Sequence, residues 1–255
     1  MISRSALVAE IRRTLADGRP SIGSWIQLPD PSVAEIMGQA GYDWVAVDLE
    51  HGSMSVSDLP NLFRALELGG TLPLARLASG SRSDCKQALD AGAGGVIIPM
   101  IESAAQLASV RDECRWPPAG QRGVGFSRAN LFGKHFDAYK NEAQSPLLVA
   151  MIEHIRAVDE LDAILSVEGL DAVLIGPYDL SASMGIVAQF DAKAFTATMM
   201  RIRDACVRYR IPCGSHVVEP DTVLLRQRIS EGHQFLAYSI DAVFLRGAAA
   251  RPGDL

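Results

Sequence analysis

Lysine is scarce in this chain, and its four lysines, Lys86, Lys134, Lys140 and Lys193, all lie outside the apolar runs that predict strands. A Schiff-base enzyme needs a desolvated lysine beside its substrate. The positions of the lysines therefore argue against a Schiff-base mechanism. The four cysteines show neither CxxC spacing nor the density of a disulfide scaffold, which favours reduced thiols and a cytoplasmic protein.

Long apolar runs and basic clusters are also missing. No stretch approaches the roughly 18 consecutive apolar residues of a membrane span. Charged residues interrupt the N-terminal segment where a signal peptide would have its apolar centre. The net charge is −6 at pH 7, with no basic block. We therefore expect neither a membrane nor a nucleic-acid partner. GxGxxG and P-loop motifs are absent as well, which removes the usual sign of a nucleotide-binding sheet.

Short apolar runs alternate with helical patterns from end to end. Eight runs predict strands over residues 21–28, 44–51, 72–78, 94–100, 147–153, 172–177, 213–218 and 234–240. Helical patterns cover residues 31–40, 57–68, 83–91, 103–114, 156–167, 191–209 and 219–231, and a short one begins at 241. The count and length predict one (β/α)8 barrel domain over residues 1–255. A doubly wound open sheet is the alternative. The long connection 116–146 is expected to follow the fourth strand and to be able to form a lid.

Two carboxylates end successive apolar runs, Glu153 after LLVAMI and Asp179 after AVLIGPY. Neighbouring parallel strands lie roughly 4.8 Å apart and end at one edge. Like charges that close need a cation, a shared proton or a basic partner. Hard oxygen donors suit Mg²⁺ or Mn²⁺. The sequence therefore predicts a divalent-metal site held by Glu153 and Asp179.

Further polar residues fall at the ends of other predicted strands. The second strand ends in Asp48-Leu49-Glu50-His51, the third carries Arg76 and the seventh carries His216. Each has a structural alternative: the acids can cap helices, Arg76 can pair with a neighbouring acid, and a strand-end histidine can simply be hydrogen-bonded. A direct role for His216 stays open. Convergence of these groups at one barrel rim favours an active site.

Six motifs give the sequence a resemblance to a known family over nearly its whole length. They are GYDWVAVDLEHG (41–52), PLARL (73–77), KQALDAGAGGVIIPM (86–100), PPAGQRGVG (117–125), MIE (151–153) and IGPYDLSASMG (175–185). Together they resemble the HpcH/HpaI aldolases, the metal-dependent class II pyruvate aldolases. The resemblance implies a (β/α)8 barrel and a hexamer of dimers that exchange their last helix.

The resemblance also implies roles for individual residues. The metal ligands fall on Glu153 and Asp179, the catalytic base on His51, its dyad aspartate on Asp90 and the arginine for the keto oxygen on Arg76. The backbone N–H groups of Tyr178 and Asp179 would meet the pyruvate carboxylate. Asp48 and Glu50 would contact the metal ligands rather than the metal itself, or would reach the metal through a water molecule. Met151 and Tyr178 depart from the family pattern beside the acceptor position, which leaves the natural substrate open.

The expected function is that of a carbon–carbon lyase. With Mg²⁺, Mn²⁺ or Co²⁺ it would cleave or form 4-hydroxy-2-keto acids through a pyruvate enolate, so that its partners are a small keto acid and an aldehyde. The alternatives are a siderophore-type citrate synthase, a phosphoenolpyruvate mutase or lyase relative, and a barrel without catalytic function.

Asp90 leads to an expectation about assembly. It ends the helix after the third strand and so lies away from the predicted site. In a homo-oligomer it could instead reach His51 of a neighbouring subunit. The closing helix, expected from Asp241 to about Arg251, is too short to cover the barrel alone.

Overall fold

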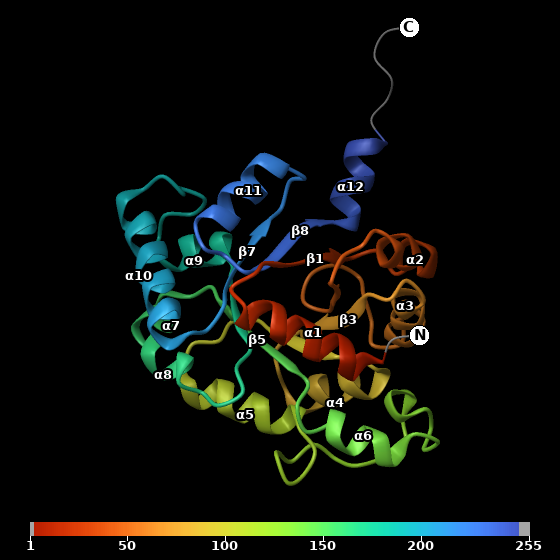
Figure 1. Ribbon diagram of the computed structural model, residues 1–255. Helices are drawn as coiled ribbons and strands as arrows, with labels where there is room; N and C mark the ends of the chain where they lie inside the picture. The colour runs from red at the N-terminus through yellow and green to blue at the C-terminus, as the bar shows by residue number, and fades with distance from the viewer. Residues whose placement is uncertain (1–2, 250–255) are drawn as a thin grey trace, which may run out of the picture.

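The computed structural model describes residues 3–249, which form a closed barrel of eight parallel strands paired in chain order (Figure 1). The strands are β1 Ser21–Ile26, β2 Trp44–Asp48, β3 Leu72–Arg76, β4 Gly95–Ile98, β5 Leu147–Ile152, β6 Ala172–Ile175, β7 Cys213–Val217 and β8 Phe235–Ile240. Because β8 pairs with β1 and closes the sheet, the predicted (β/α)8 fold is confirmed and the open-sheet alternative is excluded.

Most helices connect successive strands around the outside of the barrel, whereas α1 precedes β1 and α12 follows β8 (Figure 1). They are α1 Arg4–Ala16, α2 Pro31–Gln39, α3 Leu59–Leu68, α4 Arg82–Ala91, α5 Ala104–Cys114, α6 Phe136–Glu142, α7 Ile155–Asp159, α8 Leu161–Leu165, α9 Pro177–Ser183, α10 Lys193–Tyr209, α11 Thr222–Ser230 and α12 Asp241–Ala248. The pattern over 156–167 predicted one helix, but two short helices meet at Glu160. The short α6 and α9 were not predicted.

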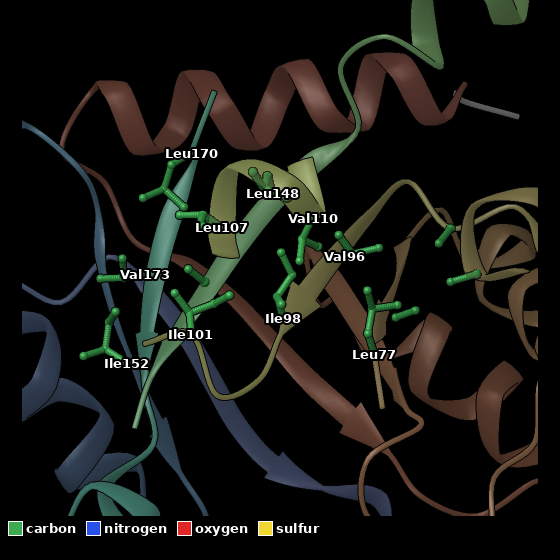
Figure 2. Packing of buried hydrophobic residues seen from close by; sticks show 14 of the residues in the cluster. Leu77, Val96, Ile98, Ile101, Leu107, Val110, Leu148, Ile152, Leu170 and Val173 are labelled. Atoms are coloured by element: carbon green, nitrogen blue, oxygen red, sulfur yellow. The ribbon is translucent and has the colours of Figure 1, made fainter. Parts of the chain in front are cut away.

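Alternating strand residues build two apolar layers. Outward-facing residues such as Val96, Ile98 and Leu148 pack against Leu107 and Val110 of α5 (Figure 2). Their inward-facing neighbours form a separate buried cluster inside the barrel. This period of two buries both faces of every strand, as a parallel barrel requires.

Aromatic rings fill the N-terminal end of the barrel. The Trp44 and Phe235 rings, from the first residues of β2 and β8, stack with centroids 4.3 Å apart. Gly23 makes room for this stack, because a Cβ there would lie 2.1 Å from the Trp44 ring. The space for a ligand is therefore at the opposite end, where the strands finish.

The long connection between α5 and β5 does not form a lid, and that expectation is wrong. It starts after the helix that follows β4, so it lies at the N-terminal end of the barrel, away from the strand ends that form the site. Arg4 of α1 donates to the Ala129 carbonyl and pairs with Glu142 at 2.8 Å. Arg128 donates to the Ala91 carbonyl at 2.8 Å. These contacts anchor the connection to α1 and α4.

The closing helix α12 continues from β8 and points away from the barrel (Figure 1). Its Leu245 side chain is exposed. The expected helix end near Arg251 lies outside the described residues. Across residues 3–249, none of the helices combines the length and the apolarity needed to cross a bilayer.

Candidate active site

The C-terminal ends of β2, β3, β5 and β6, with the loops and helix that follow them, bring the predicted polar groups to one rim. Asp48 ends β2 and pairs in register with Arg76, which ends β3. Glu153 directly follows β5. Asp179 is exposed in the first turn of α9, where the positive end of the helix dipole favours a carboxylate. This placement follows from the parallel strands, which all end at the same side.

Asp48 organises one half of the rim. Its buried carboxylate accepts from Arg76 Nε at 2.8 Å and Nη2 at 2.5 Å, and from Gln27 Nε2 at 2.9 Å. It also accepts from the backbone N–H groups of Glu50 and His51. Burial raises the pKa of Asp48, but the Arg76 hydrogen bond and charge outweigh burial and hold the pKa below its usual value. Asp48 therefore fixes both the arginine and the loop that carries His51.

Arg76 is held from three sides. Its guanidinium lies over the Trp25 ring, 4.7 Å from the centroid, in a cation–π arrangement. Nε and Nη2 are committed to Asp48, while Nη1 lies 3.1 Å from Glu50 Oε2. Arg76 therefore does pair with neighbouring acids, which was the structural alternative for this residue. Of the three guanidinium nitrogens, Nη1 is the one that Asp48 does not engage, and it is the group that a substrate oxygen could use.

Glu153 is a buried carboxylate, with 2% of the residue exposed. Its Oε1 accepts from the Met100 N–H at 2.6 Å, and a Cβ at Gly176 would lie 2.5 Å from Oε2. Burial raises the pKa of Glu153 to about 7; the Met100 N–H lowers it, while the charges of Glu50 and Asp179 raise it further. Glycine at 176 therefore leaves the space that the Glu153 side chain occupies.

The acidic groups of the rim fit a divalent cation. Glu50, Glu153 and Asp179 repel one another through space, and the buried Glu50 Oε2 accepts no hydrogen bond although Arg76 Nη1 lies 3.1 Å away as its ion-pair partner. A cation would relieve this repulsion and would favour the ionised form of Glu153. Within residues 3–249, no three His, Cys, Asp or Glu side chains gather closely enough to form a complete metal cluster. A pair of protein ligands would therefore leave coordination positions for substrate and water oxygens.

His51 and Asp90 are not brought together within one chain. His51 is exposed in the loop after β2. Asp90 lies in the last turn of α4, as predicted, beside Lys86, Arg128 and Phe132 around a cavity of about 410 Å³. No hydrogen bond or ion pair between these two described residues joins them.

Sequence reasoning missed several groups of the rim. Trp25 beneath Arg76, Gln27 beside Asp48 and the Met100 N–H on Glu153 carry no motif of their own. Their contacts cross between strands, so spacing along the chain gives no signal for them. All four lysines are exposed and lie outside the strands, which confirms the absence of a barrel lysine.

The closed barrel with an acidic, arginine-bearing rim defines the chain as a (β/α)8 barrel of the kind that carries active sites at its strand ends. The model of the HpcH/HpaI aldolase/citrate lyase family matches residues 21–248, and the chain belongs to that family.

Two relatives and one solved structure illustrate the similarity. The 2-keto-3-deoxy-L-rhamnonate aldolase of Salmonella gallinarum is 37% identical over 90% of this chain and 86% of its own length. The 4-hydroxy-2-oxovalerate aldolase of Novosphingobium aromaticivorans is 34% identical over 94% of this chain and 92% of its own. A crystal structure of an HpcH/HpaI aldolase/citrate lyase family protein from Burkholderia cenocepacia superposes with a TM-score of 0.88 and 31% identity, covering 94% of this chain and 95% of that one.

Proposed function

We propose that this protein is a divalent-metal-dependent aldolase that cleaves or forms 4-hydroxy-2-keto acids through a pyruvate enolate. The observation that carries the proposal is the buried Glu153 carboxylate, which faces the charges of Asp179 and Glu50 beside Arg76. Relatives named as aldolases over most of the chain support the same reaction class. Their two named substrates differ, because 2-keto-3-deoxy-L-rhamnonate carries one hydroxyl beyond C4, at C5, and 4-hydroxy-2-oxovalerate carries none.

Glu153 and Asp179 would hold the metal ion, with Glu50 behind them. A divalent ion bound there would supply a Lewis acid for the keto oxygen of the substrate. Arg76 Nη1 would donate to the same oxygen as negative charge develops on it. Since Asp48 and Trp25 already fix the guanidinium, this donor is positioned before the substrate arrives.

Residues of the loop after β2 and of the first turn of α9 would carry out the remaining steps. His51 would take the proton of the C4 hydroxyl, directly or through a water, as the C3–C4 bond breaks to give an aldehyde and the enolate. The N–H groups of Tyr178 and Asp179, in the first turn of α9, would donate to the substrate carboxylate. Protonation of the enolate carbon then yields pyruvate, and reversal of these steps forms the bond.

The proposed assembly is a homo-oligomer with Asp90 serving His51 of a neighbouring subunit. Support comes from the connection after α5, whose apolar side chains Val124, Phe126 and Phe132 are exposed, Phe132 beside Asp90. A subunit interface would bury these side chains together with Asp90. The expected hexamer and exchanged helix belong to the same proposal.

Proton exchange of pyruvate tests the enolate half of the reaction. Pyruvate is incubated with the protein in deuterated water, and loss of the methyl proton signal is followed by NMR. We expect exchange with Mg²⁺, Mn²⁺ or Co²⁺, none with excess chelator, and no covalent trapping by borohydride because none of the four lysines lies on a barrel strand. Pyruvate release from a panel of 4-hydroxy-2-keto acids then tests cleavage. Exchange that survives chelation, or no release from any member, would contradict the proposal.

A further inference from the structure

His216 is a polar residue of the barrel interior to which the proposed reaction gives no task. It lies near the end of β7, and its ring centroid is 5.8 Å from that of Trp25. The Arg76 guanidinium lies over the same Trp25 ring. The charges of Arg76 and Asp48 also act on the imidazole. His216 therefore lies in the same layer as the groups proposed to handle the substrate.

The hydrogen bond of His216 fixes the tautomer of the ring. Nε2 lies 3.3 Å from the Ser239 carbonyl oxygen. A carbonyl oxygen only accepts, so Nε2 carries the hydrogen and Nδ1 keeps its lone pair. Burial lowers the pKa of His216 to about 4; the Ser239 carbonyl raises it and Arg76 lowers it further. The imidazole is therefore neutral at physiological pH, with Nδ1 as an acceptor.

The backbone at Ser239 supports this arrangement. Ser239 has φ of 56°, a left-handed conformation that a non-glycine residue rarely adopts within a strand. The β1–β8 register shifts between Gly23 and Trp25, at the same level. The Ser239 carbonyl accepts from His216 Nε2 and from Ser24 Oγ, at 3.3 Å each. The departure from regular β structure thus coincides with the contact that orients the histidine.

Nδ1 of His216 is open. It makes no hydrogen bond to any residue from 3 to 249. It is also not one of the fully buried side-chain atoms that lack a partner. His233 differs, because its Nδ1 is sealed inside the protein without a partner. His216 lines a cavity of about 560 Å³ together with Pro177 and Tyr178, so its Nδ1 is a neutral acceptor that a bound molecule can reach.

The chemistry of the substrate decides which group can use this acceptor. The pyruvate half offers only carboxylate and keto oxygens, which are themselves acceptors and would face the Nδ1 lone pair unfavourably. Hydroxyl donors occur in the aldehyde half, and the C4 hydroxyl is assigned to His51. We propose that His216 Nδ1 accepts a hydrogen bond from a hydroxyl next to the aldehyde carbon, so that the enzyme selects α-hydroxyaldehydes. This inference rests on the proposed aldolase function.

The test compares two acceptors that differ by one hydroxyl, glycolaldehyde and acetaldehyde, in their addition to pyruvate. We expect the wild type to prefer glycolaldehyde. His216→Leu removes the acceptor and should lower kcat/KM for glycolaldehyde about tenfold, with less than a twofold change for acetaldehyde. His216→Gln keeps an accepting oxygen and should restore part of the preference. Pyruvate proton exchange should stay within about twofold in both variants, because the enolate half does not use His216.

Several results would overturn the inference. A wild type without preference for glycolaldehyde overturns it even if the variants fail to fold. Equal losses with both acceptors, an unchanged ratio in His216→Leu, or an effect seen only when hydroxypyruvate replaces pyruvate would do the same. In each of these cases the enzyme still forms carbon–carbon bonds, so the aldolase proposal stands. A wild type that neither exchanges pyruvate protons nor adds pyruvate to either acceptor overturns both.

Discussion

Neutralising Glu153 should make the metal-free protein more stable at alkaline pH. Glu153→Gln keeps an oxygen that can accept a hydrogen bond from the Met100 N–H. It removes the negative charge that burial and the charges of Glu50 and Asp179 destabilise. The pKa of the wild-type carboxyl is about 7 in the folded protein, against an ordinary value of 4.5. At about 1.36 kcal/mol for each tenfold change in proton affinity, this difference amounts to roughly 3 kcal/mol.

The direction follows from proton linkage. The folded state holds the Glu153 proton more tightly than the unfolded state, so protonation of Glu153 stabilises the folded protein. This stabilisation is complete below pH 4.5 and is lost as pH rises through about 7. We expect the wild-type free energy of unfolding in chelator to fall by roughly 3 kcal/mol relative to Glu153→Gln between pH 4.5 and pH 8. Added Mn²⁺ at pH 8 should restore stability to the wild type and much less to the variant.

Urea unfolding followed by circular dichroism, at fixed protein concentration and several pH values, measures this difference. Glu35→Gln is the matched control, since Glu35 is an exposed carboxylate on α2 away from the rim. The difference between Glu153→Gln and wild type is compared with that of this control at each pH. A difference for Glu153→Gln that does not depend on pH would refute the argument that burial and neighbouring carboxylates disfavour the ionised form of Glu153.

Three further substitutions separate the proposed roles, and a mixture with a fourth, Asp90→Asn, tests the shared site. Arg76→Lys should lose proton exchange and cleavage together, because a point charge cannot hold Asp48 with two donors and still offer a third; retained exchange would count against Arg76 at the keto oxygen. His51→Ala should lose cleavage more than exchange, and equal losses would mean that His51 also handles the C3 proton. Asp179→Asn should weaken Mn²⁺ binding by at least tenfold in calorimetry, and unchanged affinity would remove Asp179 from the metal site. Mixing inactive His51→Ala with inactive Asp90→Asn under subunit exchange should restore some activity, whereas a fully active monomer would exclude the shared site.

To predict from the sequence at which end of the barrel a connecting segment lies, one must know whether it follows a strand or a helix. The segment 116–146 was correctly predicted to be long, but it was assigned to the wrong end of the barrel. Its place after α5, rather than directly after β4, sends it to the N-terminal end, where Arg4 and Arg128 hold it. The same rule correctly placed Asp90 in the last turn of α4. In a barrel, a segment's face depends on whether it follows a strand or a helix.

The barrel and the position of its rim residues could be read from local patterns. Alternating apolar runs and helical spacing recur eight times, and strand ends are visible where a run meets Asp48, Arg76 or Glu153. A parallel barrel collects all such ends on one side, so local periodicity is enough to bring these groups to the same rim.

Tertiary contacts alone decided how each rim group behaves. Asp48 occupies two nitrogens of Arg76, Met100 and Gly176 shape the pocket of Glu153, and Ser239 fixes the tautomer of His216. These partners come from different strands or from the loops that follow them. Burial and charge act through space, so the pKa of a carboxyl or the free nitrogen of an imidazole depends on neighbours that sequence spacing does not identify.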